Sequence, residues 1–196
     1  MPFRLIVGLG NVGDRYDGTR HNVGFYVLDA LASKKNLAWA YDEKREAFVS
    51  KFVYGVFSIV LAKPTTLMNS SGSAVAKLCH FYKIHPTEVV VVYDDIAFDV
   101  GDFRMTSSEG TGGHNGVADV LNKIGGGFVR LRVGIGQKPI KQMDLKDHVI
   151  SKFSQEEIDI LDKIMHEIFS CLKLLLDKGI EYTMNFANRK KPYGRG

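Results

Sequence analysis

The stretch from Glu88 to Tyr93, with the sequence EVVVVY, restricts the fold more than any other part of the chain. A strand with one face in water alternates apolar and polar residues, whereas this stretch is apolar from Val89 through Tyr93. It therefore predicts a central strand that is covered on both faces, and the strand ends on Asp94 and Asp95. Sheets that contain such strands carry helices on each side.

Further strands and helices alternate along the chain. The apolar patterns predict strands at residues 4–8, 103–106 and 129–135, and a hairpin of residues 47–54 and 57–61 that is interrupted at Lys63-Pro64. Helices are predicted to start near Asn22, at residues 70–82 and 115–124, and after the capping-box sequence that begins at Ser154, up to Gly179. This order predicts a single-domain, three-layer α/β/α sandwich with a mixed central sheet.

The length of 196 residues fits one domain, and no repeat or linker divides it. We expect a domain over residues 1–187 and a basic C-terminal tail over 188–196. The tail contains Arg189, Lys190, Lys191 and Arg195, and their four positive charges account for the net charge of +4. Overall charge is therefore a weak argument for a nucleic-acid partner, and a solubilising terminus is the simpler interpretation of the tail.

The apolar runs and the cysteines of the chain indicate its cellular compartment. The chain contains neither a run of about 18 apolar residues nor a signal-peptide pattern. Cys79 and Cys171 both lie in apolar stretches with helical spacing, so we expect buried thiols in a reducing compartment and no disulfide. These features predict a cytoplasmic protein without a membrane partner.

The segment from Gly8 to Gly13 has the spacing GxGxxG after a strand, which is typical of dinucleotide-binding proteins. In that fold the third glycine lies in a helix that packs on the sheet. Residues 14–20 have no apolar face, and Asp29, at a plausible distance for the acidic residue, belongs to a helical pattern. A dinucleotide-dependent oxidoreductase is therefore a weak alternative, and no cofactor is expected.

Four segments place amide or ionisable side chains next to predicted strand or helix ends. Ligand crevices in α/β domains form at the carboxyl ends of strands, so the four segments are candidates to converge on one site. Each also has a simpler interpretation, because His21, Asn22, Asn69 and Asn115 can start or cap helices and aspartates favour turns. The four segments are Asn11 with Thr19–Asn22, Met68–Asn69, Asp94–Asp95, and Gly112–Gly116.

The chemistry open to such a set is narrow. The chain has no glycine-framed serine elbow, and neither HExxH nor CxxC spacing, so we expect no acyl-enzyme nucleophile and no metal. His21 can take a proton from water while Asp94 holds its other ring nitrogen. Amides from Asn11, Asn69 and Asn115 can bind a carbonyl-rich substrate. A positioned base contributes about 10²- to 10⁴-fold in rate, so metal-free hydrolysis by an activated water is a sufficient mechanism.

Ordered motifs in the same segments resemble those of bacterial peptidyl-tRNA hydrolase. The resemblance runs from residue 4 to about residue 188. The motifs that carry it are LIVGLGN at 5–11 with Tyr16, TRHN at 19–22, KPTTLMN at 63–69 with Ser71-Gly72, YDD at 93–95, GGHNG at 112–116 and RLRVGIG at 130–136.

The resemblance implies a monomeric, metal-free enzyme that cleaves the ester between a peptide and the 3′ end of tRNA. His21 resembles the general base and Asp94 the carboxylate that orients it. The residues that resemble the peptide-binding set are Asn11, Asn69 and Asn115, which hold the peptide and its carbonyl, Met68, which lines the channel, and Tyr16, near the mouth.

The resemblance also implies that a tRNA acceptor stem is bound through its phosphates, so basic side chains are the candidates for that contact. They are Arg104, Arg132, Lys138, Lys141 and Lys146. The chain departs from the family at Thr106, where a phosphate-gripping lysine is common, and at Ser107 to Glu109, in place of a glycine-rich stretch. Residues 96–100 also replace a Leu-Asp-Leu-Pro-like turn. A non-hydrolytic RNA-binding relative remains an alternative, against which the pair of His21 and Asp94 argues.

Overall fold

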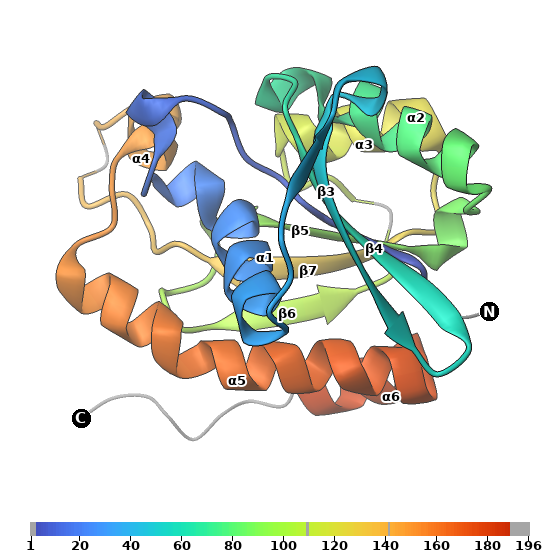
Figure 1. The fold of residues 1–196 in the computed structure, drawn as a ribbon. Helices are drawn as coiled ribbons and strands as arrows, with labels where there is room; N and C mark the ends of the chain where they lie inside the picture. The colour runs from blue at the N-terminus through green and yellow to red at the C-terminus, as the bar shows by residue number, and fades with distance from the viewer. Residues whose placement is uncertain (1–2, 109, 141, 189–196) are drawn as a thin grey trace.

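The computed structural model describes residues 3–188 except 109 and 141. Seven strands form one sheet in the order β2-β3-β4-β1-β5-β7-β6 (Figure 1). β4, β1, β5 and β7 are parallel neighbours, while β2, β3 and β4 pair antiparallel and β6 runs antiparallel to β7. The sheet is therefore mixed, as predicted. The strands are β1 (Leu5–Gly8), β2 (Ala40–Asp42), β3 (Ala47–Tyr54), β4 (Phe57–Pro64), β5 (Val89–Asp95), β6 (Phe103–Thr106) and β7 (Val129–Gly134).

Helices cover both faces of this sheet. In Figure 1, α1, α5 and α6 lie on one side and α2 and α3 on the other. The helices are α1 (Val23–Lys34), α2 (Ser71–Tyr82), α3 (Asn115–Ile124), α4 (Leu145–Ile150), α5 (Gln155–Lys178) and α6 (Ile180–Ala187). Short 3₁₀ turns span Asp14–Tyr16, Arg20–Asn22, Glu43–Arg45, Met68–Ser70 and Pro86–Glu88. The three-layer α/β/α prediction is confirmed.

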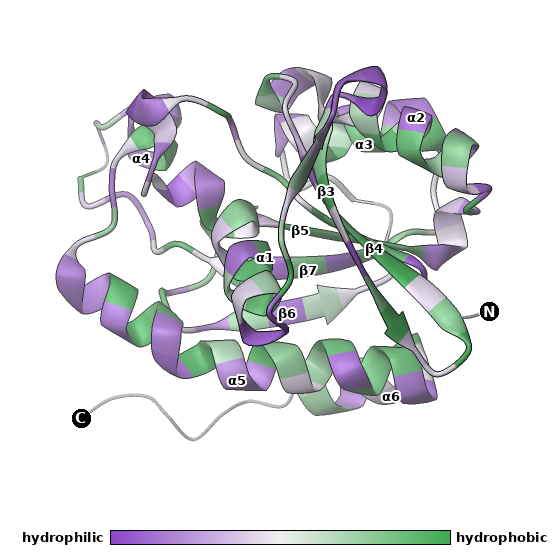
Figure 2. Ribbon diagram, viewed as in Figure 1, coloured by the Kyte–Doolittle hydropathy of each residue, from purple (hydrophilic) through white to green (hydrophobic). Residues whose placement is uncertain are grey.

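β5 has the central position predicted from its apolar sequence. Val90 and Val92 belong to the core beneath α1 and α5, whereas Val89 and Val91 belong to the core beneath α2 and α3. All four are fully buried. Figure 2 shows this hydrophobic strand in the interior of the fold. Burying one valine side chain stabilises a protein by roughly 1.5–3 kcal/mol, which explains why this strand is an organising element.

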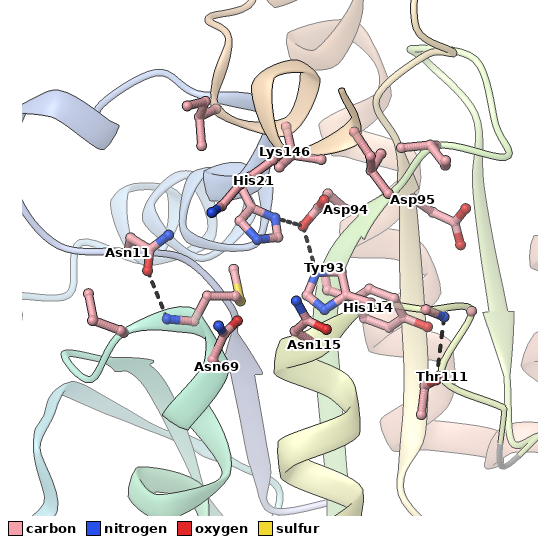
Figure 3. Close-up of a pocket in the computed structure, with 18 of the residues that line it drawn as sticks. Asn11, His21, Asn69, Tyr93, Asp94, Asp95, Thr111, His114, Asn115 and Lys146 are labelled. Carbon is pink, nitrogen blue, oxygen red and sulfur yellow. Dashed lines mark hydrogen bonds and ion pairs between the residues drawn. The ribbon is translucent and has the colours of Figure 1, made fainter. Parts of the chain in front are cut away.

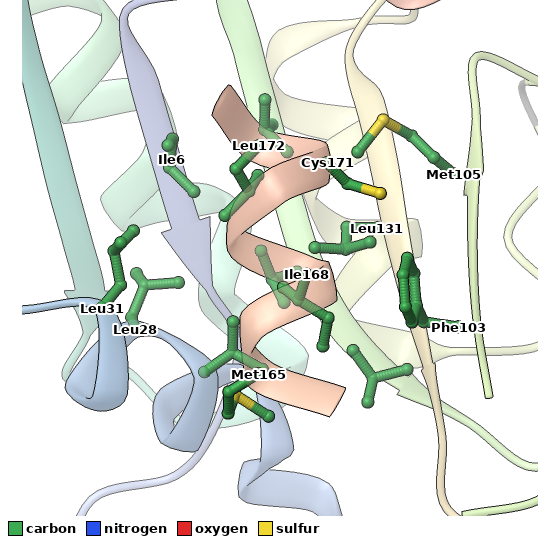
Figure 4. Close-up of a cluster of buried hydrophobic side chains, with 14 of the residues drawn as sticks. Ile6, Leu28, Leu31, Phe103, Met105, Leu131, Met165, Ile168, Cys171 and Leu172 are labelled. Carbon is green, nitrogen blue, oxygen red and sulfur yellow. The ribbon is translucent and has the colours of Figure 1, made fainter. Parts of the chain in front are cut away.

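α5 forms as its sequence predicts. Glu157 N–H donates to Ser154 Oγ at 3.3 Å and Ser154 N–H donates to Glu157 Oε2 at 2.8 Å, which completes the capping box. The helix ends before Gly179, whose φ of 79° favours glycine. The apolar side of the helix packs against the sheet, with Ile168 and Leu172 in the cluster that Figure 4 shows.

Glycines bring α1 unusually close to the sheet. A Cβ on Gly8 would lie 2.3 Å from the carbonyl oxygen of Gly24, and one on Gly24 would lie 2.5 Å from that of Val92. After Gly13 the chain forms only the 3₁₀ turn Asp14–Tyr16. The helix that a dinucleotide site requires is absent from this segment, and Gly8 in the GxGxxG sequence serves packing instead.

Several elements differ from the expectation. An interruption was predicted at Lys63-Pro64, but β4 continues to Pro64. β1 pairs with β4 only as far as Ala62, so the N–H that Pro64 lacks costs no hydrogen bond to β1. The short elements β2, α4 and α6 were not predicted. Cys79 and Cys171 are buried thiols in α2 and α5, as expected.

Two boundary features concern the ends of the described chain. Asn188, assigned above to the tail, exchanges two hydrogen bonds with the backbone of Met105 in β6, so the packed domain includes this residue. The basic residues predicted at 189–196 lie outside the described residues. In the part of the chain that is described, none of the helices has the length and hydropathy needed to cross a membrane.

Candidate active site

A pocket of about 490 Å³ lies beyond the carboxyl ends of β1 and β5. It brings together the four segments that the sequence suggested, and α4 supplies a further wall. The predicted residues that line it are Asn11, Tyr16, His21, Met68, Asn69, Asp94 and Asn115. The same pocket is lined by His114 and by Leu145, Lys146, Val149 and Ile150 of α4 (Figure 3). The convergence of the segments is thus confirmed.

His21 and Asp94 form the predicted pair. His21 occupies the middle of the 3₁₀ turn that precedes α1, and its Nδ1 lies 2.8 Å from Asp94 Oδ1. The side chain of Asp94 is only 3% exposed, whereas that of His21 is 16% exposed. The carboxylate is therefore held in the protein interior, and the imidazole connects it with the pocket.

His114, to which the sequence reasoning assigned no role, joins this pair. Its Nε2 lies 2.8 Å from the same Oδ1 of Asp94, and its Nδ1 accepts the backbone N–H of Val117 at 3.2 Å. A nitrogen that accepts carries no proton, so the ring proton of neutral His114 is assigned to Nε2 and points at Asp94. The only signal in the sequence was its place in the GGHNG motif beside Asn115.

The ionisation of Asp94 determines which ring nitrogen of His21 carries the proton. Burial by itself raises the pKa of this carboxyl, but the charge and hydrogen bonds of His114 and His21 outweigh burial and hold the pKa below its ordinary range. An ionised carboxylate only accepts, so His21 Nδ1 carries the proton. The lone pair of neutral His21 is therefore on Nε2, the nitrogen that a general base needs.

Aromatic packing supports the two imidazoles. The rings of His21 and His114 lie 5.1 Å apart, and Tyr93 contacts His114 edge-on with ring centroids 4.9 Å apart. Burial raises the pKa of Tyr93 to about 12, with Arg132 and Arg130 opposing the shift, so its hydroxyl stays protonated at neutral pH. Tyr93 thus contributes a neutral wall.

Asn11 is oriented by its neighbours. Its backbone N–H donates to Asn22 Oδ1 at 2.8 Å, and Asn22 Nδ2 donates to the Asn11 carbonyl at 2.9 Å. Met68 N–H donates to Asn11 Oδ1 at 2.8 Å, which assigns the amide orientation. The Nδ2 group of Asn11 consequently faces the His21 side of the pocket in Figure 3 and is available to a substrate oxygen.

Asn69 and Asn115 are exposed residues of the pocket lining. Neither caps a helix, since Ser70 is the N-cap residue of α2 and the His114 side chain caps α3. Among the described residues, neither amide side chain has a hydrogen-bond partner. The alternative interpretation of these two asparagines as caps is therefore wrong, and their polar groups remain free for a ligand.

Tyr16 and Met68 also lie at the pocket. Tyr16 ends a 3₁₀ turn, with the Arg15 guanidinium 4.5 Å from its ring centroid. Met68 is 3% exposed and contributes an apolar surface. A Cβ on Gly116 would lie 2.5 Å from Met68 Sδ, so the start of α3 packs tightly against this methionine.

The basic side chains predicted to bind tRNA lie in two different parts of the structure. Arg104 and Arg132 are paired across β6 and β7, and their guanidinium carbons lie 5.4 and 4.8 Å from the centroid of the Phe98 ring. Arg132 Nε also donates to Asp95 Oδ2 at 2.6 Å, which partly offsets its charge. The two arginines therefore form one basic surface beside Asp95, the neighbour of Asp94.

The lysine candidates come from the segment after β7. Lys146 on α4 lines the pocket, and Lys138 Nζ donates to the carbonyl of Met143 at 2.9 Å. Lys141 lies outside the described residues, as does Glu109. At the family's lysine position, the Thr106 hydroxyl is hydrogen-bonded to Ser108 at 3.0 Å.

His21, Asp94 and His114 also place three potential metal-ligand atoms within 4.8 Å of one another. A metal on His114 Nε2 would move the ring proton to Nδ1, where it would face the N–H of Val117. The donors present therefore fit a hydrogen-bonded network better than a metal centre.

The family model described as peptidyl-tRNA hydrolase matches residues 5–194. The chain belongs to the peptidyl-tRNA hydrolase family. A family member from Sulfurihydrogenibium is 42% identical over 95% of this chain and 97% of its own length. A chloroplastic peptidyl-tRNA hydrolase from Arabidopsis thaliana is 41% identical over 95% of this chain and 65% of its own length.

A solved structure of peptidyl-tRNA hydrolase from Acinetobacter baumannii shows the same fold. It has a TM-score of 0.89 and 35% identity, and the match covers 97% of this chain and 96% of the other. The resemblance inferred from the motifs is therefore confirmed over nearly the whole chain.

Proposed function

We propose that this chain hydrolyses the ester that joins a peptide to the 3′-terminal ribose of tRNA, with His21 as general base. The observation that carries the proposal is the hydrogen-bonded chain from His114 through Asp94 to His21. It leaves a basic nitrogen on the ring of His21, in a pocket fringed with amides. Family membership supports the same substrate.

The reaction follows from this arrangement. A water oxygen bonds to the ester carbonyl carbon while His21 Nε2 takes the proton of that water. The bond between the carbonyl carbon and the ribose 3′ oxygen then breaks, and the ribose oxygen receives the proton from His21. Asp94 stabilises the imidazolium formed between the two steps. The leaving alkoxide lies next to a vicinal hydroxyl, so one base and a few donors suffice.

The amides supply the second part of catalysis. Nδ2 groups of Asn11, Asn69 and Asn115 donate to the peptide and to the oxygen that becomes negative in the tetrahedral intermediate. Loss of one such donor costs about 10²- to 10³-fold in rate in well-studied hydrolases. Met68 and Tyr16 provide apolar and aromatic surface for the peptide. No step requires a metal or a cofactor.

The tRNA is held by its phosphates. Arg104 and Arg132 form the basic surface beside the pocket, and Lys138 and Lys146 come from the segment after β7. Lys141 stays a candidate from the sequence alone. Such contacts position the acceptor stem without reading its sequence. With Thr106 at the family's lysine position, we propose that the arginine pair carries much of this binding.

A monomeric state and a cytoplasmic location remain predictions, and sedimentation of the purified chain tests the former.

The test is release of labelled peptide from an N-acylated aminoacyl-tRNA. We expect turnover by the intact chain and a loss of about 10²- to 10⁴-fold in His21→Ala, with tRNA binding retained. His80→Ala is the matched control, since His80 is an exposed histidine on α2 outside the pocket lining. Equal turnover by His21→Ala and the intact chain would refute the base assignment.

A further inference from the structure

Arg20, directly before His21 in the chain, joins three segments through its guanidinium. Its Nη1 donates to the carbonyl of Ile135 at 2.9 Å and to Glu157 Oε1 at 2.8 Å, and its Nη2 donates to Glu157 Oε2 at 2.8 Å. Its Nε donates to Ser151 Oγ at 3.1 Å. The segment that follows β7, the end of α4 and the start of α5 therefore meet at one side chain.

The backbone around Arg20 is tied to the same region. Its N–H donates to the carbonyl of Ser151 at 3.0 Å, and Thr19 forms an isolated antiparallel bridge with Lys152. The Phe153 ring lies 5.0 Å from the guanidinium carbon. Arg20 is thus bound by main chain, charge and an aromatic ring, although it does not line the pocket.

The residue on the other side of His21 has a corresponding attachment. Asn22 is bound to Asn11 by the two hydrogen bonds described above, and Asn11 is bound to Met68. Three consecutive residues therefore have separate tasks. His21 faces Asp94, while Asn22 fixes one end of its 3₁₀ turn to the peptide side of the pocket and Arg20 fixes the other end to the α4 side.

The Arg20 contacts also concern α4. Ser151 is the C-cap residue of α4, and its side chain donates to the carbonyl of His148 at 2.7 Å. Four residues of this short helix line the pocket across from the asparagines. The same guanidinium that holds the turn of His21 therefore holds the end of the helix that forms the opposite wall.

We propose that Arg20 is a positioning residue that sets the orientation of His21 relative to Asp94 and to the α4 wall. The proposal rests on the proposed function, since it concerns the same base. Catalytic groups must be held within about 0.5 Å and 10–20° of the productive geometry. A misplacement of about 1 Å costs roughly 10²-fold in rate.

Lysine cannot replace this arginine. Arg20 presents a planar fork that meets both oxygens of Glu157 while Nε reaches Ser151. A lysine ammonium is a single point of charge and cannot span these partners. The proposal therefore predicts that charge alone does not restore the function of this position.

A purely structural role is the competing explanation, and Arg45 provides the matched control. Arg45 forms an ion pair with Asp42 at 2.6 Å and lies 3.8 Å from the centroid of the Phe81 ring, with a side chain that is 20% exposed against 13% for Arg20. It does not line the catalytic pocket. Arg45→Gln thus removes a similar interaction at a site remote from His21.

The experiment compares Arg20→Gln, Arg20→Lys, Glu157→Gln and Arg45→Gln in the full chain. Each is assayed for kcat and KM on N-acylated aminoacyl-tRNA, well below its own melting temperature. We expect kcat to fall about 10- to 100-fold in Arg20→Gln with KM nearly unchanged. Glu157→Gln should lose less, because Ser151 and Ile135 still bind Arg20, and Arg20→Lys should recover only part of the rate.

A second measurement follows the imidazole directly. Proton–nitrogen NMR spectra of the histidine rings report which nitrogen carries the proton. In the intact chain and in Arg45→Gln we expect the signals of one His21 tautomer, and in Arg20→Gln a mixture. This arm needs no turnover, so it tests Arg20 even if the intact chain fails to hydrolyse the substrate, an outcome that would instead overturn the proposed function.

The proposal is wrong if folded Arg20→Gln keeps the kcat and the His21 tautomer of the intact chain. It is equally wrong if Arg45→Gln loses as much kcat as Arg20→Gln, because the loss would then follow stability and not position. Should Arg20→Gln fail to fold, Glu157→Gln tests the proposal instead, since it breaks the bidentate pair and leaves Arg20 in place. An unchanged kcat and an unchanged His21 tautomer in Glu157→Gln would then overturn the proposal.

Discussion

His114 accepts a hydrogen bond from the backbone N–H of Val117 at 3.2 Å, and this contact sets the direction of the hydrogen bonds in the site. Because the N–H occupies Nδ1, the proton of His114 lies on Nε2 and is donated to Asp94. Asp94 then accepts a second hydrogen bond, from Nδ1 of His21. A backbone group at the start of α3 thereby orients a base that is distant in sequence.

Replacement of Asp94 by asparagine should lower kcat by about 10²- to 10⁴-fold. An amide at this position can donate to His21 Nδ1 and so favour the wrong tautomer. The measurement is single-turnover ester cleavage with substrate in excess of its dissociation constant. A rate in Asp94→Asn equal to that of the intact chain would remove the carboxylate from the mechanism.

Replacement of His114 by alanine should affect both stability and rate. Val117 N–H and Asp94 each lose a partner in a largely buried site, and an unsatisfied buried group costs about 1–3 kcal/mol. We expect that loss in urea unfolding, together with a decrease in kcat of about tenfold from the disordered dyad. His80→Ala, at an exposed position of α2 outside the pocket lining, should change neither quantity.

The low pKa of Asp94 predicts a pH dependence of stability. Its unfolded pKa is about 3.9, and in the folded chain His114 and His21 overcome burial and hold it lower. The carboxylate therefore stabilises the fold above pH ~4, and this contribution is lost as the pH falls through the folded pKa. Urea unfolding from pH 3 to pH 6 should show a steeper decline for the intact chain than for Asp94→Asn. Parallel curves would contradict the shift.

Hydrolysis should persist after metal removal. The protein is treated with a chelator and desalted, and it is assayed on a short N-acylaminoacyl oligonucleotide ester that needs no magnesium to fold. We expect an unchanged rate, since the Nε2 proton of His114 points at Asp94, where a metal would bind. A loss of activity that zinc restores would show instead that His21, Asp94 and His114 form a metal centre.

The Cys79 thiol should be inert in the folded protein. Burial, with a contribution from Glu88, raises its pKa to about 11, so little thiolate exists at pH 8. A thiol-reactive dye at that pH should label Cys79 slowly in the native chain and fast in denaturant. Fast native labelling, located by peptide mapping, would contradict its burial in α2.

Long, strongly patterned segments were predictable from sequence. The apolar run of β5 and the capping box of α5 specify their structures locally, through burial on both faces and through a side chain that satisfies its own helix end. The elements missed, β2, α4 and α6, are short. Local preference is weak over so few residues, and packing against the rest of the chain decides their conformation.

The candidate site was predictable as a set of residues but not as a network. Residue types and spacing identified His21, Asp94 and the three asparagines, because few side chains can move a proton or bind a carbonyl. They did not identify His114 or Arg20, whose roles depend on partners 20 and 137 positions away in the chain.

What the sequence by itself determined is therefore the placement of the strongly patterned strands and helices and the chemical groups at their ends. Only the tertiary structure decided which nitrogen of each histidine carries a proton and which groups hold the turn of His21. The physical reason is that hydrogen-bond direction depends on distances of about 3 Å between groups that the fold, and not the local sequence, brings together.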